Sequence, residues 1–229
     1  MQKLTQFFIF MCCLALSSNS AAFSINQLSQ VQATNSLKQL LEQGSDIAIK
    51  QLGQNGGFSQ SPKWRIKLPN ALQKPAKLMR TFGQGKYVNE LEDSLNTAAE
   101  QAIPHAKELL LNAISKIRLE DAKQILSAHP TAATDFLKRT SEADLRARFL
   151  PIVQQQTNQS VLSQQYSQVA SKAKKFGFSS DKVTSIEDYV TEQAITALFA
   201  ALAEQESALR ANPKQAAGSL LKQVLEGLR

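Results

Sequence analysis

Few residues in this chain of 229 have the types and spacing that chemistry requires, and it contains only two histidines. His105 precedes Glu108 by three residues, a spacing that places both side chains on one face of a helix. Di-iron helical bundles use such pairs, but they need a second His–Glu pair and further glutamates from facing helices. The sequence has no second pair. We therefore expect no metal site.

Motifs for nucleophilic catalysis and phosphate binding are also incomplete. No Gly-x-Ser-x-Gly sequence is present to expose a serine nucleophile, and only His105 and His129 are available as a histidine base. Gly83-Gln84-Gly85-Lys86 is a glycine turn before a helix, but it lacks the rest of a phosphate-binding loop. We therefore expect no catalytic residue and no cofactor, and we predict that the protein is not an enzyme.

The first 22 residues have the layout of a secretory signal peptide. Lys3 precedes an apolar run over residues 7–16, and Ser20-Ala21-Ala22 places small residues at the −3 and −1 positions of a cut before Phe23. A transmembrane anchor needs about 20 apolar residues, and the run is shorter. A lipoprotein is a second alternative, but the bulky residues 9–11 before Cys12 do not suit acylation. We expect an exported protein with no transmembrane segment after cleavage.

Cleavage at this point removes both cysteines, Cys12 and Cys13. The remaining chain then has no disulfide, no thiolate metal site and no cysteine nucleophile. Secreted eukaryotic domains of this size carry disulfides more often, so a cysteine-free exported chain is more typical of a bacterium. We expect the periplasm of a Gram-negative bacterium.

Positive charge is concentrated in one segment of the chain, between Asp46 and Glu90. Residues 47–89 contain eight basic and no acidic residues, whereas the rest of the chain after residue 22 contains 17 basic and 19 acidic residues. The eight are Lys50, Lys63, Arg65, Lys67, Lys74, Lys77, Arg80 and Lys86. The same segment holds the only tryptophan, Trp64. Basic and aromatic residues together suit a surface that receives an anionic partner.

The segment from Lys50 to Lys86 is therefore predicted to bind a lipid, lipopolysaccharide or another anionic component of the envelope, and nucleic acid is not expected. The predicted binding residues are Lys63, Trp64, Arg65, Lys67, Lys77 and Arg80. The alternative is a solvated face whose charges pair with the acidic helices that follow. The binding prediction requires that Lys63, Arg65, Lys67 and Arg80 share one face and are not each paired with a helix carboxylate.

Two functions fit this charge pattern. The first is a non-enzymatic periplasmic protein that binds a lipid or anionic amphiphile, with an apolar groove between helices and the basic segment at the anionic head. The second is an envelope scaffold or chaperone-like interaction module that has no small-molecule ligand and presents the same basic face to a membrane or an acidic protein. An enclosed apolar cavity would favour the first, and a filled core with an exposed apolar patch would favour the second.

Helical periodicity dominates the chain after the signal peptide and predicts one all-α domain over residues 23–229, a bundle of about eight helices. Pro104 and Pro151 are expected to kink two of them. Residues 54–69 are predicted to form an extended loop, and a Ser141–Asp144 capping pair predicts that a helix begins at Thr140. Predicted helices cover about residues 24–52, 70–82, 86–117, 120–127, 131–138, 140 onward, 161–176, 185–210 and 214–229.

The helix over residues 185–210 is apolar almost all round in its middle, at residues 194–203, so we expect it to be the central buried helix. Ser185 is its predicted cap, with Glu187 in the first turn. Pro213 is predicted to occupy the first position of the closing helix. No repeat with a period of 20 to 50 residues is present.

Several short runs resemble, in order, the bacterial family catalogued as domain of unknown function 4197. They include Gln51-Leu52-Gly53, Arg65-Ile66-Lys67-Leu68-Pro69, Thr131-Ala132-Ala133-Thr134-Asp135-Phe136, Phe149-Leu150-Pro151-Ile152-Val153 and Arg210-Ala211-Asn212-Pro213. The resemblance implies a helical, exported protein of Gram-negative bacteria. It supplies no catalytic residues.

Overall fold

The computed structural model describes residues 28–118, 120, 122–159, 162–175 and 185–228, and these residues form helices and no strand. The predicted all-α class is confirmed, while the predicted signal peptide lies outside the described residues. The α-helices are α1 (Gln30–Gly53), α2 (Asn70–Thr81), α3 (Gly85–Ala102), α4 (Ala106–Ser115), α5 (Ala122–Ser127), α6 (Ala132–Gln159), α7 (Leu162–Lys175), α8 (Ile186–Ala211) and α9 (Ser219–Glu226). Two short 3-10 helices are η2 (Ile103–His105) and η3 (Pro213–Gln215).

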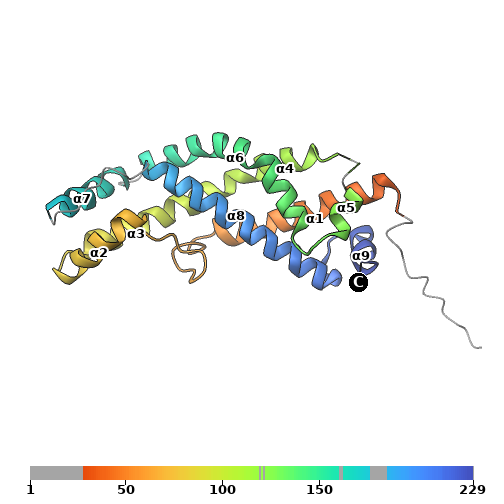
Figure 1. Ribbon diagram of the computed structural model, residues 1–229, viewed down its shortest axis with the longest axis horizontal. Helices are drawn as coiled ribbons and strands as arrows, with labels where there is room; N and C mark the ends of the chain where they lie inside the picture. The colour runs from red at the N-terminus through yellow and green to blue at the C-terminus, as the bar shows by residue number, and fades with distance from the viewer. Residues whose placement is uncertain (1–27, 119, 121, 160–161, 176–184, 229) are drawn as a thin grey trace, which may run out of the picture.

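Helix α8 is the central element of an elongated bundle, and it packs against α6 and α1 (Figure 1). Seven of its residues between 194 and 202 are buried, namely Ala194, Ile195, Ala197, Leu198, Phe199, Ala201 and Leu202. The predicted central buried helix is therefore confirmed. Helices α2, α3 and α7 form one end of the bundle, and α5 and α9 lie at the other (Figure 1). No helix in the described part of the chain has both the length and the apolar character needed to cross a membrane.

Helix α1 is continuous, and the glycine near its middle is needed for packing. Ser29 caps it with a reciprocal pair of hydrogen bonds to Gln32, of 3.1 and 3.0 Å. A Cβ atom on Gly44 would lie 2.8 Å from Leu202 Cδ1 of α8. The glycine therefore lets α1 and α8 approach closely, which offsets the intrinsic cost of about 1 kcal/mol for glycine in a helix.

The two prolines expected to kink helices act differently. Pro104 ends α3 and lies in the 3-10 helix η2, which separates α3 from α4. Pro151 lies inside α6, which continues through it as one arched helix (Figure 1). A proline removes one backbone hydrogen bond in either case. The predicted break is thus found at Pro104, whereas α6 absorbs Pro151 in its curvature.

Two predicted helix starts are wrong. Thr140 and Ser141 lie inside α6, where their hydroxyls donate to the carbonyl oxygens of Phe136 (2.8 Å) and Leu137 (2.5 Å), so they do not cap a new helix. Pro213 begins η3, and α9 starts only at Ser219. The linker between η3 and α9 is held by the Gln43 side chain of α1. It donates to Gln215 O and accepts from Ala217 N, each at 2.8 Å.

The true start of α6 is capped from another helix by the buried side chain of Glu206. This α8 carboxylate is 1% exposed and accepts hydrogen bonds from Ala133 N (3.0 Å), Thr134 N (2.7 Å) and Thr134 Oγ1 (2.7 Å). Arg210 of α8 donates to Glu206 and also to the carbonyl oxygens of Ile125 and Leu126 at the end of α5. The Glu206–Arg210 ion pair therefore provides hydrogen-bond partners for carbonyl groups at the end of α5 and for N–H groups at the start of α6.

Replacing Glu206 by Ala should strongly destabilise the protein. The change removes three hydrogen bonds to the start of α6 and leaves the Arg210 charge without its buried partner, which typically costs about 3–5 kcal/mol. Urea denaturation followed by far-UV circular dichroism measures the loss. Glu226→Ala, at an exposed position of α9, is the control and should change stability by less than about 0.5 kcal/mol. Equal stability of the two variants would contradict the assigned role.

Candidate functional site

The basic segment enters the fold through the loop over residues 54–69, and α3 holds this loop. The buried carboxylate of Glu100 accepts hydrogen bonds from Phe58 N (2.9 Å), Ser59 N (2.7 Å) and Ser59 Oγ (2.9 Å). At Gly57, a Cβ atom would lie 2.3 Å from Leu52 O. The chain therefore turns so close to the end of α1 that only glycine fits at position 57. The hydrogen bonds to Glu100 hold this turn in place.

The second part of the loop runs beside α3 without forming a strand. Asn96, which is fully buried, donates to Ile66 O (2.9 Å) and accepts from Ile66 N (2.8 Å), so its side-chain amide supplies the two hydrogen bonds that a neighbouring strand would provide. The alternation of Trp64 to Leu68 reflects burial, since Ile66 and Leu68 point into the core and Lys67 is exposed. The loop is thus a fixed surface.

Asn96→Leu should loosen this loop. The variant leaves Ile66 N and O buried without partners, and each lost hydrogen bond of this kind costs about 1–3 kcal/mol. We expect reduced stability in urea and earlier solvent exposure of Trp64, the only tryptophan, measured by its fluorescence. Asn112→Ala, on the exposed face of α4, is the control. Unchanged fluorescence and stability in Asn96→Leu would contradict this account.

Of the six predicted binding residues, Lys63 and Trp64 are engaged with the rest of the protein. Lys63 Nζ forms an ion pair with Glu204 of α8 and lies 4.8 Å from the centre of the Trp64 ring. Trp64 is half-buried and packs against the core. Both residues therefore fasten the loop to its surroundings.

Arg65 and Arg80 form a second attachment, to α3. Arg65 Nη2 lies 3.0 Å from Asp93 and 3.7 Å from Glu92, and Arg80 Nη2 lies 3.0 Å from the other oxygen of Glu92. Glu92 is only 17% exposed, so water screens these pairs less than it screens surface pairs. Together they clamp the loop and α2 onto α3. The binding prediction required that Lys63, Arg65, Lys67 and Arg80 are not each paired with a helix carboxylate. Three of these four cations, Lys63, Arg65 and Arg80, are paired in this way.

The remaining two predicted residues, Lys67 and Lys77, are exposed and form no ion pair within the described residues. Tyr189 of α8 donates from its hydroxyl to Lys67 O at 2.7 Å, and burial raises the pKa of this phenol. Burial, with a smaller contribution from the charge of Glu187, also raises the pKa of Tyr166. The structure thus brings Arg65 and Arg80 together, and separately Lys63 and Trp64, while Lys67 and Lys77 face solvent.

Helix α7 extends the exposed basic surface in a way that the sequence did not reveal. Its end lies beside the turn between α2 and α3, because Lys172 Nζ donates to Gln84 (2.9 Å) and lies 4.2 Å from the centre of the Tyr87 ring. Lys174 and Lys175 are exposed there. The sequence indicated only that these lysines suit the C-terminus of a helix. Their proximity to α2 depends on tertiary packing.

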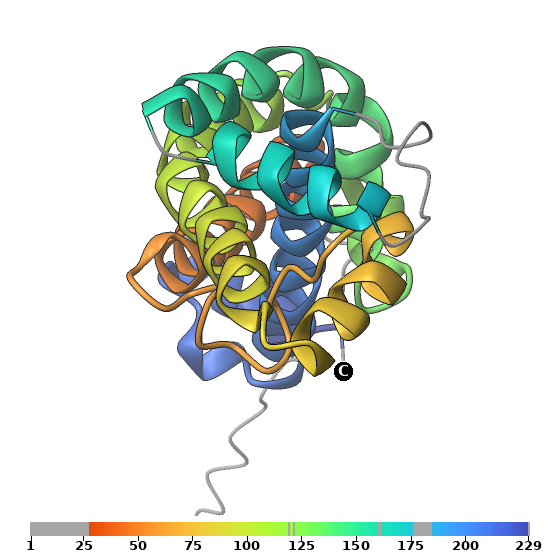
Figure 2. The ribbon, with the colours of Figure 1, turned by 90° about the vertical axis from the view of Figure 1, so that its left-hand side faces the viewer.

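We call this end of the bundle the cationic tip and define it as Lys74, Lys77, Leu78, Phe82, Lys172, Lys174 and Lys175. Figure 2 shows it with α2, α3 and α7 towards the viewer. Leu78 and Phe82 are one helical turn apart and are 37% and 61% exposed. Apart from Lys172, its lysines form no side-chain contact to a carboxylate or carbonyl within the described ranges, and α7 contains no acidic residue. The tip therefore combines exposed lysines with two exposed apolar side chains.

A groove of about 480 Å³ lies beside the tip between α3 and α7, lined by Tyr87, Ser167, Gln168, Ser171, Lys172 and Lys175. Its lining carries two cations, hydroxyl groups and no acid. The electrostatic potential of such a lining is favourable for an anionic group.

The histidines lie elsewhere. His105 is exposed in η2, and His129 contacts Thr131 Oγ1 (3.3 Å) before α6. The Thr131 hydroxyl donates to the Asp135 side chain (3.1 Å) in the first turn of α6. Among the described residues, no three His, Cys, Asp or Glu side chains come close enough to hold a metal ion.

Comparison with protein-family models matches residues 27–226 to one family, described as "Protein of unknown function (DUF4197)". The match covers most of the chain and confirms the resemblance found in the sequence. No curated protein and no solved structure matches the chain.

Proposed function

We propose that this chain, which belongs to the DUF4197 family, is an exported, non-enzymatic protein that binds anionic lipid at the surface of an envelope membrane through its cationic tip. The observation that carries the proposal is the exposed pair Leu78 and Phe82, which lies at the same end of the bundle as exposed lysines of α2 and α7. Apolar side chains beside lysines are typical of protein surfaces that lie at a membrane interface.

The hollows of the described surface favour contact with a lipid surface over an enclosed lipid cavity. Five of them have volumes of about 180–480 Å³, and each opens to solvent. Pockets that enclose a drug-sized ligand measure about 300–1,000 Å³ and bury most of it. A lipid with two acyl chains is larger than such ligands, so its head group is the part that these hollows suit.

The charge of the tip allows the strength of membrane binding to be estimated. Each lysine near an anionic membrane surface contributes about 1 kcal/mol to binding. The clamped residues Arg65 and Arg80 already face carboxylates, so they add less than Lys77 or Lys174. Binding should weaken as salt concentration rises, since exposed charges are screened over about 8 Å at physiological ionic strength.

Lys77→Glu combined with Lys174→Glu should weaken binding to vesicles of phosphatidylglycerol and phosphatidylethanolamine at least about tenfold, because two favourable charges become repulsive. Co-sedimentation at several salt concentrations measures the affinity. The matched control is Lys214→Glu with Lys222→Glu, which makes the same change of charge at the opposite end of the bundle. Leu78→Ser should weaken binding with little dependence on salt.

Failure of the unmodified protein to bind anionic vesicles, or an equal loss in the control pair, would overturn the proposal. The alternative, an interaction module whose partner is an acidic protein, predicts that cross-linking in intact cells captures a protein at the tip while vesicles stay unbound.

A further inference from the structure

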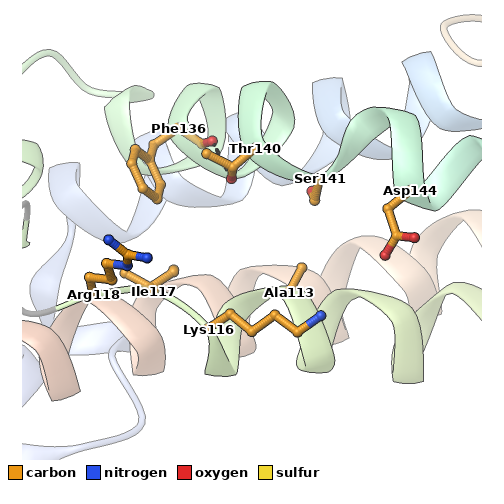
Figure 3. Close-up of a pocket in the computed structure, with 8 residues that line it drawn as sticks. All are labelled: Ala113, Lys116, Ile117, Arg118, Phe136, Thr140, Ser141 and Asp144. Carbon is orange, nitrogen blue, oxygen red and sulfur yellow. Dashed lines mark hydrogen bonds between the residues drawn. The ribbon is translucent and has the colours of Figure 1, made fainter.

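A groove between α4 and α6 lies far along the bundle from the tip (Figure 3). The groove has a volume of about 220 Å³. Ala113, Lys116, Ile117 and Arg118 line one side, and Phe136, Thr140, Ser141 and Asp144 line the other. Figure 3 shows the two sets of side chains facing each other, with the Arg118 guanidinium near the Phe136 ring.

The groove carries uncompensated positive charge. Lys116 and Arg118 are exposed, and neither forms an ion pair within the part of the chain that the structure describes. Asp144, the acidic residue of the lining, is paired with Arg148 at 3.0 Å. Cations at the end of α4 favour its helix dipole, but that end carries only about half of an elementary charge. The two positive charges of Lys116 and Arg118 are therefore larger than the partial negative charge at the end of α4.

The other residues of the groove decide how an anion would be held. The hydroxyls of Thr140 and Ser141 donate to backbone carbonyl oxygens of α6, so they are not available as donors. The half-buried Phe136 ring, against which Arg139 stacks at 5.7 Å, and the buried Ile117 form an apolar wall. An anion in the groove therefore meets donors only at Lys116 and Arg118, with apolar surface beside them.

We propose that this groove binds a small carboxylate with an apolar body. The planar fork of Arg118 matches the two oxygens of a carboxylate, and Lys116 adds a point charge. The apolar body then lies against Phe136 and Ile117. Inorganic phosphate has no apolar surface to place against Phe136 and Ile117, so the lining favours a ligand that carries both a charge and an apolar body. The volume is below the range of about 300–1,000 Å³ for drug-sized ligands, which restricts the ligand to a small molecule or a single terminal residue of a peptide.

The test uses 3-phenylpropionate and its neutral isostere 3-phenylpropionamide, with binding followed by nitrogen–proton correlation NMR of the whole protein. We expect 3-phenylpropionate to shift signals of residues 113–118 and 136–144 in a saturable way, and the amide to bind at least tenfold more weakly. A tripeptide ending in Phe, with a free or an amidated C-terminus, separates the two sources of the carboxylate. Tighter binding of the free-acid peptide than of 3-phenylpropionate would favour a peptide end over a small free acid as the source of the carboxylate.

Lys116→Met with Arg118→Met should reduce the affinity for 3-phenylpropionate at least tenfold and leave the weak binding of the amide unchanged. Lys107→Met, on α4 but outside the groove and paired with Asp46, is the matched control and should stay within twofold of the unmodified protein. Because all three side chains are exposed, thermal unfolding should show that every variant folds. Absence of saturable shifts, equal binding of acid and amide, or an equal loss in Lys107→Met would each overturn the proposal.

Discussion

The ion pair between Glu206 and Arg210 determines where two other helices begin and end. The first backbone N–H groups of an α-helix and its last carbonyl groups have no partners within the helix. Glu206 supplies acceptors to the start of α6, and Arg210 supplies donors to the end of α5. A buried pair of this kind need not add stability over a well-packed apolar pair. Its effect here is positional, since it fixes α5 and α6 to one turn of α8.

Other polar side chains on the long helices act in the same way towards segments without regular structure. Asn96 replaces a neighbouring strand for Ile66, Glu100 closes the turn at Phe58, and Gln43 of α1 holds the linker before α9. Asn96 and Glu100 would be costly to bury alone, and both are hydrogen-bonded to backbone groups that would otherwise be unsatisfied, whereas the bonds of Gln43 lie at the surface. Irregular segments thus keep a defined position, which makes the basic loop a fixed part of the surface.

Features that depend on interactions between neighbours in the sequence could be predicted, whereas features that depend on residues distant in the sequence could not. Ser185 and Pro104 act on their own neighbours, so the start of α8 and the break after α3 could be predicted. Ser141 and Asp144 matched a local capping pattern, but the actual cap of α6 is Glu206, more than 60 residues away in the sequence. The engagement of Arg65 and Arg80 by Glu92 likewise depends on which helices become neighbours, as does the approach of the α7 lysines to α2. Composition located the basic segment, but it could not divide its charges between internal and exposed positions.

The chemistry of the side chains accounts for part of that division. Both arginines of the segment bridge to carboxylates of α3. Of its six lysines, Lys63 and Lys86 form exposed ion pairs with Glu204 and Glu90, and Lys50, Lys67, Lys74 and Lys77 are exposed and unpaired in the described structure. A guanidinium holds several donors in one plane and suits a fixed contact with two carboxylates, while an ammonium on a flexible stem stays strongly hydrated. Contacts made by such lysines are individually weak and sensitive to salt, so a partner is held only where several of them act together. The cationic tip meets this condition because α7 adds its lysines to those of α2. An isolated lysine such as Lys50 does not, since it has no such neighbours within its own helix turn.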